Sequence, residues 1–235
     1  MQPEEQAVVL ANVAERAERY DDMAAYMKER VSKGGALSTE ERDLFSAAYK
    51  GTLSTRRLAV RVASSVEQQE AAEGRTANAS LAAGYRSKVE AELHEVCAEV
   101  TQLLVHSLLP QAENGEPKAF YLKMQGDYFR YMAEFMTGEA RQKAADEARI
   151  AYTAATEEAS IHLLTTHPVR LGLALNFSVF QHEVLGDTFA AVDTALAALK
   201  DAASSLEGMP EESVRDATLT MQLLQENLSL WVPEN

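Results

Sequence analysis

Apolar residues along this chain recur at the three-to-four-residue spacing of amphipathic α-helices. Only 11 Gly and 6 Pro occur in 235 residues, and most of them stand where the periodic pattern stops. Pro fits the first turn of a helix and breaks its interior, so these positions mark helix ends. The pattern predicts about nine helices, at 3–17, 19–33, 38–72, 76–109, 117–137, 140–163, 168–185, 187–205 and 210–232. Short connections make consecutive helices antiparallel, so we expect an all-α array.

Several of the predicted helix ends carry recognisable chemistry. Ser38 followed by Glu41 has the spacing of a capping box. Gly138 is expected to end the fifth helix, and Gly208–Pro210 to separate the last two. The polar stretch 69–80 predicts the loop between the third and fourth helices.

The chain is expected to form a single domain over 1–235. Neither a low-complexity linker nor a clean repeat of the 34-residue kind divides it.

Composition narrows the class of function. The formal net charge is -14, from 22 basic and 36 acidic residues, whereas general nucleic-acid binding needs the opposite sign. Cys97 is the only cysteine, so an intrachain disulfide or a Cys-based zinc site cannot form. The first residues lack a signal-peptide pattern, and no run approaches the roughly 20 apolar residues of a membrane span. We therefore expect a cytoplasmic protein with no nucleic-acid partner and no membrane span.

Patterns of catalytic residues are missing from the sequence. The five His residues form neither H-E-x-x-H nor an E-x-x-H pair, and no G-x-S-x-G, P-loop or G-x-G-x-x-G occurs. His167, which precedes Pro168, is interpreted as a helix-start residue. We expect no catalytic residue, no metal site and no cofactor, so the chain is predicted not to be an enzyme.

The last predicted helix has two apolar stripes instead of one. The first consists of Val214, Ala217, Met221, Leu224, Leu228 and Trp231. The second, roughly a quarter to a third of a turn away, consists of Leu219, Leu223 and Leu230, with Asn227 in the same sector. The helix at 168–185 repeats this arrangement with Leu175, Asn176, Val179 and Glu183. Burial on two sides is one explanation, and the wall of a peptide groove is the other. The amides favour a groove, because a peptide main chain supplies their partners.

Positive charge is concentrated on two helices of this acidic chain. Residues 50–61 contain four basic side chains and no acidic one. The cationic pairs that lie seven residues apart, and hence on one helix face, are Lys50 with Arg57 and Lys123 with Arg130. Asp127 and Tyr131 lie on the same side as the second pair. A solvated charged surface is the common explanation, but guanidinium groups beside a phenol also suit a dianionic phosphate. Periodicity does not place the two helices relative to each other.

Several segments that together span nearly the whole chain resemble the 14-3-3 family. They are Arg19–Ala24, Glu40–Lys50, Tyr121–Tyr131, His167–Phe180 and Thr218–Trp231. The resemblance implies a cup-shaped protomer of nine helices that dimerises through its N-terminal helices. It also implies an adaptor that holds phosphorylated Ser/Thr segments of client proteins in an amphipathic groove, and regulates those clients by sequestration or conformational clamping.

The resemblance assigns roles to individual residues. The phosphate-binding residues would be Lys50, Arg57, Arg130 and Tyr131. The peptide-binding residues would be Lys123, Leu175, Asn176, Val179, Glu183, Leu219, Leu223, Asn227, Leu230 and Trp231. The dimer contacts would be Arg19, Asp22, Tyr85, Lys88 and Glu92. The implied partners are phosphorylated clients and a second copy of the chain, or a paralogue in a heterodimer. The resemblance also implies two functional parts of the single domain: residues of about 1–110 would serve dimerisation and the phosphate side, and about 117–232 would complete the peptide groove.

Three features depart from the family pattern. Ala59 stands where many relatives carry a phosphorylatable Ser, so that route to a monomer is not expected here. Thr220 replaces a more apolar residue beside the groove. The chain ends four residues after Trp231 without an acidic tail, which leaves a naturally short tail and a shortened chain both open. The alternative function is a helical-repeat scaffold that binds unphosphorylated peptides.

Overall fold

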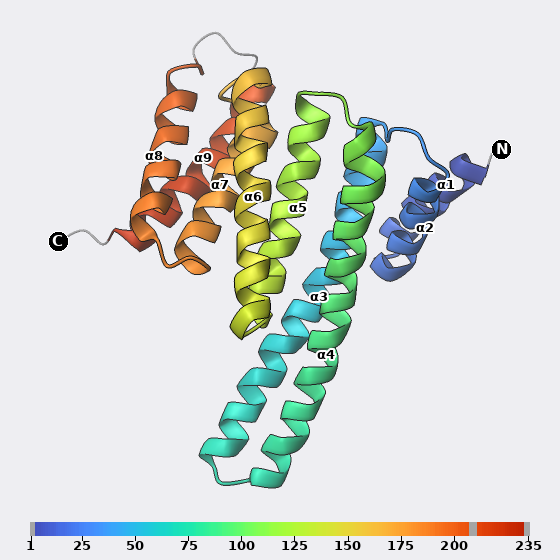
Figure 1. Cartoon of the computed structure of the whole chain (residues 1–235), viewed down its shortest axis with the longest axis vertical. Coiled ribbons are helices and arrows are strands. Elements are labelled where there is room, and N and C mark those ends of the chain that lie inside the picture. Colours follow the sequence, from blue (N-terminus) through green and yellow to red (C-terminus); the bar gives the residue numbers. More distant parts are fainter. Residues whose placement is uncertain (1–2, 207–210, 233–235) are drawn as a thin grey trace. The chain divides into compact units, whose positions relative to one another are not determined.

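The computed structural model of this chain describes residues 3–206 and 211–232. Within those ranges it contains nine α-helices, one π-helical turn and one 3-10 turn, and it has no β-strand (Figure 1). The predicted all-α fold class is confirmed. The separation expected at Gly208–Pro210 lies outside the described residues.

The chain consists of two compact units, Met1–Gln111 and Ala112–Asn235. The helices of the first unit are α1 (Pro3–Arg16), α2 (Tyr20–Ser32), α3 (Thr39–Ala72) and α4 (Thr76–Leu103), followed by the turns Leu104–Leu108 and Leu109–Gln111. The helices of the second unit are α5 (Glu116–Phe135), α6 (Gly138–His162), α7 (Pro168–Glu183), α8 (Thr188–Ala203) and α9 (Glu211–Trp231).

In the first unit α3 and α4 run side by side as a long antiparallel pair (Figure 1). The other two helices, α1 and α2, pack against each other and against α3. The core contains fully buried large side chains, among them Met27, Phe45, Tyr49 and Leu93. Cys97 is buried among them, as an apolar helical context predicts.

The loop between the third and fourth helices is confirmed, but it is shorter than the predicted stretch 69–80, because α3 continues to Ala72 and α4 begins at Thr76, as the predicted helix bounds 38–72 and 76–109 require. The residues of this stretch are polar, but Glu, Gln and Ala are good helix formers and their exposed side chains pair at the surface. Arg75 Nη2 donates to Glu70 Oε1 at 2.7 Å, and Asn78 Nδ2 donates to Glu70 Oε2 at 2.8 Å. The polar residues of this stretch therefore lie at the solvent-exposed ends of α3 and α4, on either side of the short loop.

The end of the fourth predicted helix, 76–109, is also different from the prediction. The α-helical pattern stops at Leu103 and is followed by a π-helical turn and a 3-10 turn. The Leu109 N–H donates to the Leu104 carbonyl, five residues back. Pro110 cannot donate to a carbonyl of the preceding turn, so a regular helix cannot extend beyond it.

Two predicted helix starts are confirmed and one glycine is reassigned. Ser38 Oγ accepts from Glu41 N at 3.2 Å, and Glu41 Oε2 accepts from Ser38 N at 2.8 Å, which completes the capping box. His167 Nδ1 accepts from Val169 N at the start of α7. Gly138 begins α6 instead of ending α5, because Met136 and Thr137 are already extended.

In the second unit α5 and α6 pack together, and α7 contacts α5, α6, α8 and α9. Ala residues along α6 form much of the buried face, so neighbouring helices approach it closely. The aromatic centre of this core is Tyr152 with Phe177 and Phe180, at ring-centroid distances of 5.3 and 5.4 Å from Tyr152. A smaller apolar cluster, which includes Leu171, Ala195 and Leu224, joins α7, α8 and α9.

Candidate functional site

The first unit carries two of the candidate phosphate-binding residues, both on α3. Lys50 is exposed and makes no ion pair within the described part of the chain, and Arg57 is half-buried. Arg56 is directed elsewhere, because its Nη1 lies 2.8 Å from Asp21 Oδ1 and its Nε lies 3.9 Å from Glu92 Oε2. Among the basic side chains of 50–61, Arg56 therefore holds α3 to α2 and α4.

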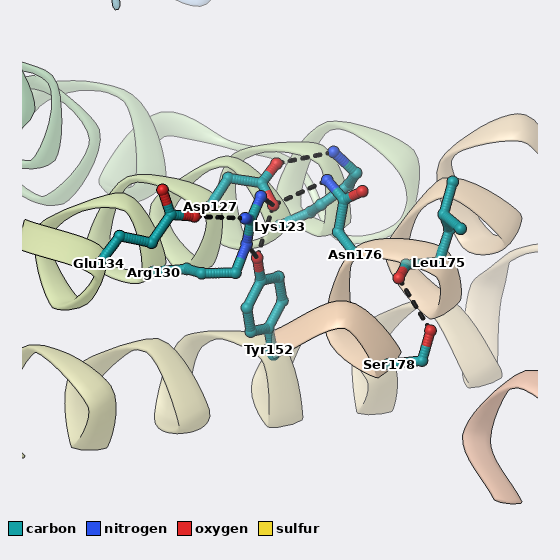
Figure 2. A network of polar contacts seen from close by, with 8 residues as sticks. All are labelled: Lys123, Asp127, Arg130, Glu134, Tyr152, Leu175, Asn176 and Ser178. Carbon is teal, nitrogen blue, oxygen red and sulfur yellow. Dashed lines mark hydrogen bonds and ion pairs between the residues drawn. The ribbon is translucent and has the colours of Figure 1, made fainter. Parts of the chain in front are cut away.

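The second unit gathers the candidate residues of α5 and α7 around one carboxylate, Asp127 (Figure 2). Its side chain receives three hydrogen bonds, one each from α5, α6 and α7. Lys123 Nζ lies 2.8 Å from Oδ2, while the Tyr152 hydroxyl and Asn176 Nδ2 lie 2.6 and 2.8 Å from Oδ1. Asp127 is only 7% exposed. Helix spacing predicted that Asp127 and Lys123 share a face, and the structure adds Tyr152 and Asn176.

Arg130 is held by the same cluster. Its Nε donates to the Tyr152 hydroxyl at 3.2 Å, and its Nη1 donates to Glu134 Oε1 at 3.0 Å (Figure 2). The guanidinium carbon lies 4.4 Å from the centre of the Tyr131 ring, in cation–π geometry. Arg130 is buried, so its planar fork is restricted before any ligand arrives.

The protonation states in this cluster follow from its charges. Burial alone would raise the pKa of Asp127, but Lys123 and Arg130 lower that pKa below its usual value. Burial and the neighbouring Asp127 carboxylate raise the pKa of Tyr152 well above its usual value. Burial opposes the charge of Arg130, yet Tyr152 and Asp127 raise its pKa. At neutral pH the cluster thus contains an ionised Asp127, a neutral Tyr152 and a charged Arg130.

Gly126 allows Tyr152 to reach Asp127. A Cβ at Gly126 would lie 2.8 Å from the Tyr152 ring, closer than real Cβ contacts allow. Neither residue was recognised as functional from the sequence. An isolated Gly inside a helical pattern is a signal of close approach that points to Gly126. Tyr152 has no such signal, because the rotation of α6 against α5 depends on tertiary packing.

The second apolar stripe of α9 is exposed. Leu219, Leu223 and Leu230 are 62%, 43% and 78% exposed, whereas Ala217 and Leu224 of the first stripe are buried. Burial on two sides, the simpler of the two explanations, is therefore wrong for α9. Large apolar side chains that are exposed together on one face often mark a binding surface. The second stripe of α9 is therefore available to a ligand.

The remaining candidate groove residues of α7 and α9 are partly or fully accessible. Leu175, Asn176 and Val179 are half-buried, Glu183 is exposed, and Asn227 is half-buried. The Trp231 indole is half-buried and stacks on the His182 ring at 4.9 Å. Leu175 and Trp231 both pack against the apolar cluster that joins α7, α8 and α9, so part of each side chain serves the core.

The candidate dimer residues lie at the surface of the first unit. Arg19 forms an ion pair with Asp22 in α2, and Lys88 Nζ lies 3.9 Å from Glu92 Oε1 in α4. Tyr85 is exposed and lines an apolar groove between α3 and α4, which we call the α3–α4 groove. This groove has a volume of about 650 Å³, and its other apolar lining residues are Leu58, Ala59, Val62, Ala63, Val66, Leu81 and Ala82.

Among the described residues, no group of three or more His, Cys, Asp or Glu side chains is arranged to hold a metal ion. No helix in those ranges has the length and hydropathy that a membrane crossing requires.

We expect Tyr152→Phe to destabilise the protein and to make it more sensitive to acid. The change removes a donor from the buried Asp127 carboxylate, which should lower the free energy of unfolding by about 1–3 kcal/mol at pH 7. The lowered pKa of Asp127 gives stability that is present above the unfolded-state value of about 3.9 and is lost as pH falls through the folded-state pKa. Losing the donor raises that folded pKa, so acid unfolding should begin at a higher pH.

Circular dichroism melting curves between neutral and acidic pH measure both effects. Tyr26→Phe is the matched control, since its hydroxyl makes no hydrogen bond within the described residues. An acid profile for Tyr152→Phe that coincides with wild type would show that the hydroxyl does not support the Asp127 carboxylate.

Comparison with known proteins gives one consistent family. The family model described as 14-3-3 protein matches residues 10–232. The chain is 46% identical over 230 residues to 14-3-3 protein 3 of Entamoeba histolytica, covering 98% of this chain and 96% of that protein. It is 47% identical to the checkpoint signal transducer rad24 of Schizosaccharomyces pombe, covering 98% of this chain and 85% of that protein. It is 49% identical to 14-3-3 protein zeta of Bombyx mori, covering 98% of this chain and 92% of that protein. With this coverage and the all-α fold, the chain belongs to the 14-3-3 family of adaptor proteins.

Proposed function

We propose that this protein is an adaptor that binds phosphorylated Ser/Thr motifs of client proteins and regulates those clients by sequestration or conformational clamping. The observation that supports this best is the cluster around Asp127. It restrains the Arg130 guanidinium and the Asn176 amide together in the second unit. An anion-binding group and a main-chain-binding group held by one carboxylate suit a phosphorylated peptide more than a free anion.

The phosphoryl group is assigned to Lys50, Arg57, Arg130 and Tyr131. Charge-assisted hydrogen bonds contribute roughly 1.5–3 kcal/mol each, so a few of them give a large preference for the phosphorylated peptide. The main chain is assigned to Asn176 and Asn227. The exposed leucines of α9, with Leu175 and Val179 of α7, would contact the apolar side chains of the client. Lys123, Glu183 and Trp231 complete the proposed set.

Two further features belong to this proposal and rest on family membership. The protein would act in the cytoplasm, and residues 1–235 would work as a single domain. A net charge of -14 disfavours nucleic acid as a competing partner. A scaffold that binds unphosphorylated peptides is the alternative, and it predicts no preference for phosphate.

Calorimetric titration with an Arg-x-x-Ser-x-Pro peptide, with and without phosphate on the Ser, tests the proposal. We expect the phosphorylated form to bind at least about 100-fold more tightly, which corresponds to about 2.7 kcal/mol. Lys50→Gln should weaken the phosphorylated peptide about tenfold, since an exposed cation is lost, and should leave the unphosphorylated peptide unchanged. Lys33→Gln removes another exposed lysine of the first unit and serves as the control.

Equal affinities for the two peptides would contradict phosphate recognition and favour the alternative scaffold. A Lys50→Gln effect no larger than that of Lys33→Gln would contradict the assignment of Lys50 and leave the function itself intact.

We also propose that the chain forms a homodimer, or a heterodimer with a paralogue, through its first unit. Val9, Leu10 and Val13 of α1 are exposed although they are large and apolar. They complement the apolar α3–α4 groove, so α1 of one protomer would pack into the groove of its partner. Arg19, Asp22, Tyr85, Lys88 and Glu92 would supply the polar contacts at its rim. Ala59 lines this groove and has no hydroxyl for phosphorylation.

Sedimentation velocity tests this dimer. The double variant Leu58→Glu/Leu81→Glu should sediment as a monomer, because association would bury two unpaired carboxylates. Ile150→Glu/Leu196→Glu is the control, since both residues are exposed apolar side chains of the second unit. If the groove variant and the control had the same sedimentation coefficient as wild type, this interface would be wrong.

A further inference from the structure

The side-chain amide of Asn176 has a defined orientation. Its Nδ2 lies 2.8 Å from Asp127 Oδ1, and its carbonyl oxygen points away from the carboxylate (Figure 2). An ionised carboxylate only accepts hydrogen bonds. The nitrogen of the amide must therefore face Asp127, and the reversed amide would place two oxygens against each other. The hydrogen bond to an acceptor-only carboxylate therefore determines that the carbonyl oxygen of Asn176 faces away from Asp127.

The Asp127 carboxylate is itself immobile. Lys123 Nζ at 2.8 Å engages one oxygen, and the Tyr152 hydroxyl at 2.6 Å engages the other together with Asn176. The Tyr152 ring is fixed in turn by Phe177, Phe180 and the close approach of Gly126. Rotation of the carboxylate would break hydrogen bonds to two other helices at a site that is only 7% exposed. The orientation imposed on Asn176 is therefore stable.

We infer that Asp127 is a positioning residue for peptide binding: it holds the Asn176 amide so that the carbonyl oxygen accepts a main-chain N–H of the ligand. This inference rests on the proposed function, because it requires a peptide ligand. A residue without a main-chain N–H, such as proline, cannot satisfy this acceptor. Asp127 thus makes the site selective for a main-chain donor at one place in the peptide.

Asp127→Asn removes this constraint with almost no change in shape. An amide at this position offers both a carbonyl oxygen and an NH₂ group, so it can pair with either end of Asn176. The Asn176 amide is then free to turn, and its oxygen no longer faces the ligand in every molecule. The expected signature is a loss of discrimination between peptides with and without the relevant N–H, beyond any general loss of affinity.

Ester substitution in the peptide main chain measures this discrimination. The probe is the phosphorylated Arg-x-x-Ser-x-Pro peptide, together with versions in which one N–H at a time is replaced by an ester oxygen. Calorimetry with the full chain gives, for each protein, the ratio of ester to amide dissociation constants. Wild type should show one position with a ratio of about ten, the value of one hydrogen bond. Asn176→Leu should bring that ratio to about one.

The Asp127→Asn variant should lower the same ratio to about threefold or less, since the amide is only sometimes oriented correctly. Asp146→Asn is the matched control, because this half-buried carboxylate of α6 pairs with Arg149 at 3.0 Å and touches none of the cluster. It should keep the wild-type ratio.

Two results would overturn the inference. One is an Asp127→Asn variant that binds every peptide more weakly but keeps the full ester ratio, since Asp127 would then only stabilise the fold. The other is a wild type with no ester-sensitive position that depends on Asn176. If Asp127→Asn loses its helical circular dichroism, the charge-balanced Lys123→Gln/Asp127→Asn variant replaces it, and the same ratio decides. Failure of the proposed function is seen separately, as equal binding of the phosphorylated and unphosphorylated amide peptides.

Discussion

A buried negative charge, the carboxylate of Asp127, organises the second unit. Burying a charge is unfavourable unless hydrogen bonds and opposite charges replace its water shell. Lys123, Tyr152 and Asn176 provide that replacement from three different helices. The same contacts fix α5, α6 and α7 to one another and restrain Arg130 and Asn176, which are proposed to bind the ligand. Stability and the proposed binding would therefore depend on the same few hydrogen bonds.

This arrangement would allow an acidic protein to select a phosphorylated peptide, as the proposed function requires. The positive charges of Lys123 and Arg130 stand beside the carboxylates of Asp127 and Glu134, so that cluster is close to neutral. A simple anion gains little there, because it competes with carboxylates already in place. A phosphopeptide adds main-chain contacts to an oriented amide and apolar contacts to the exposed leucines of α9. The selectivity of the protein for phosphopeptides would come from this combination of contacts, because its net charge of -14 repels other anions.

Periodicity predicted the helices and both stripes of α9, because those depend on spacing within one element. It also placed Asp127 on the side of Arg130. The polar stretch 69–80 predicted a longer loop than the one observed, because polar side-chain pairs at the surface support the two helix ends there. Tyr152 was not predicted, because its contact with Asp127 joins residues 25 apart and needs the close approach at Gly126. The link to Asn176 spans 49 residues and likewise depends on tertiary packing.

In the proposed complex, cations of the protein hold the phosphoryl group of a bound client. The most direct measurement is ³¹P nuclear magnetic resonance of the phosphorylated peptide, titrated with acid while it is bound to the full chain. The second pKa of a free phosphoserine is about 6, and neighbouring cations favour the dianion. Binding is therefore expected to lower this pKa clearly below the value of the free peptide. An unchanged or raised pKa in the saturated complex would show that protein cations do not hold the phosphoryl group.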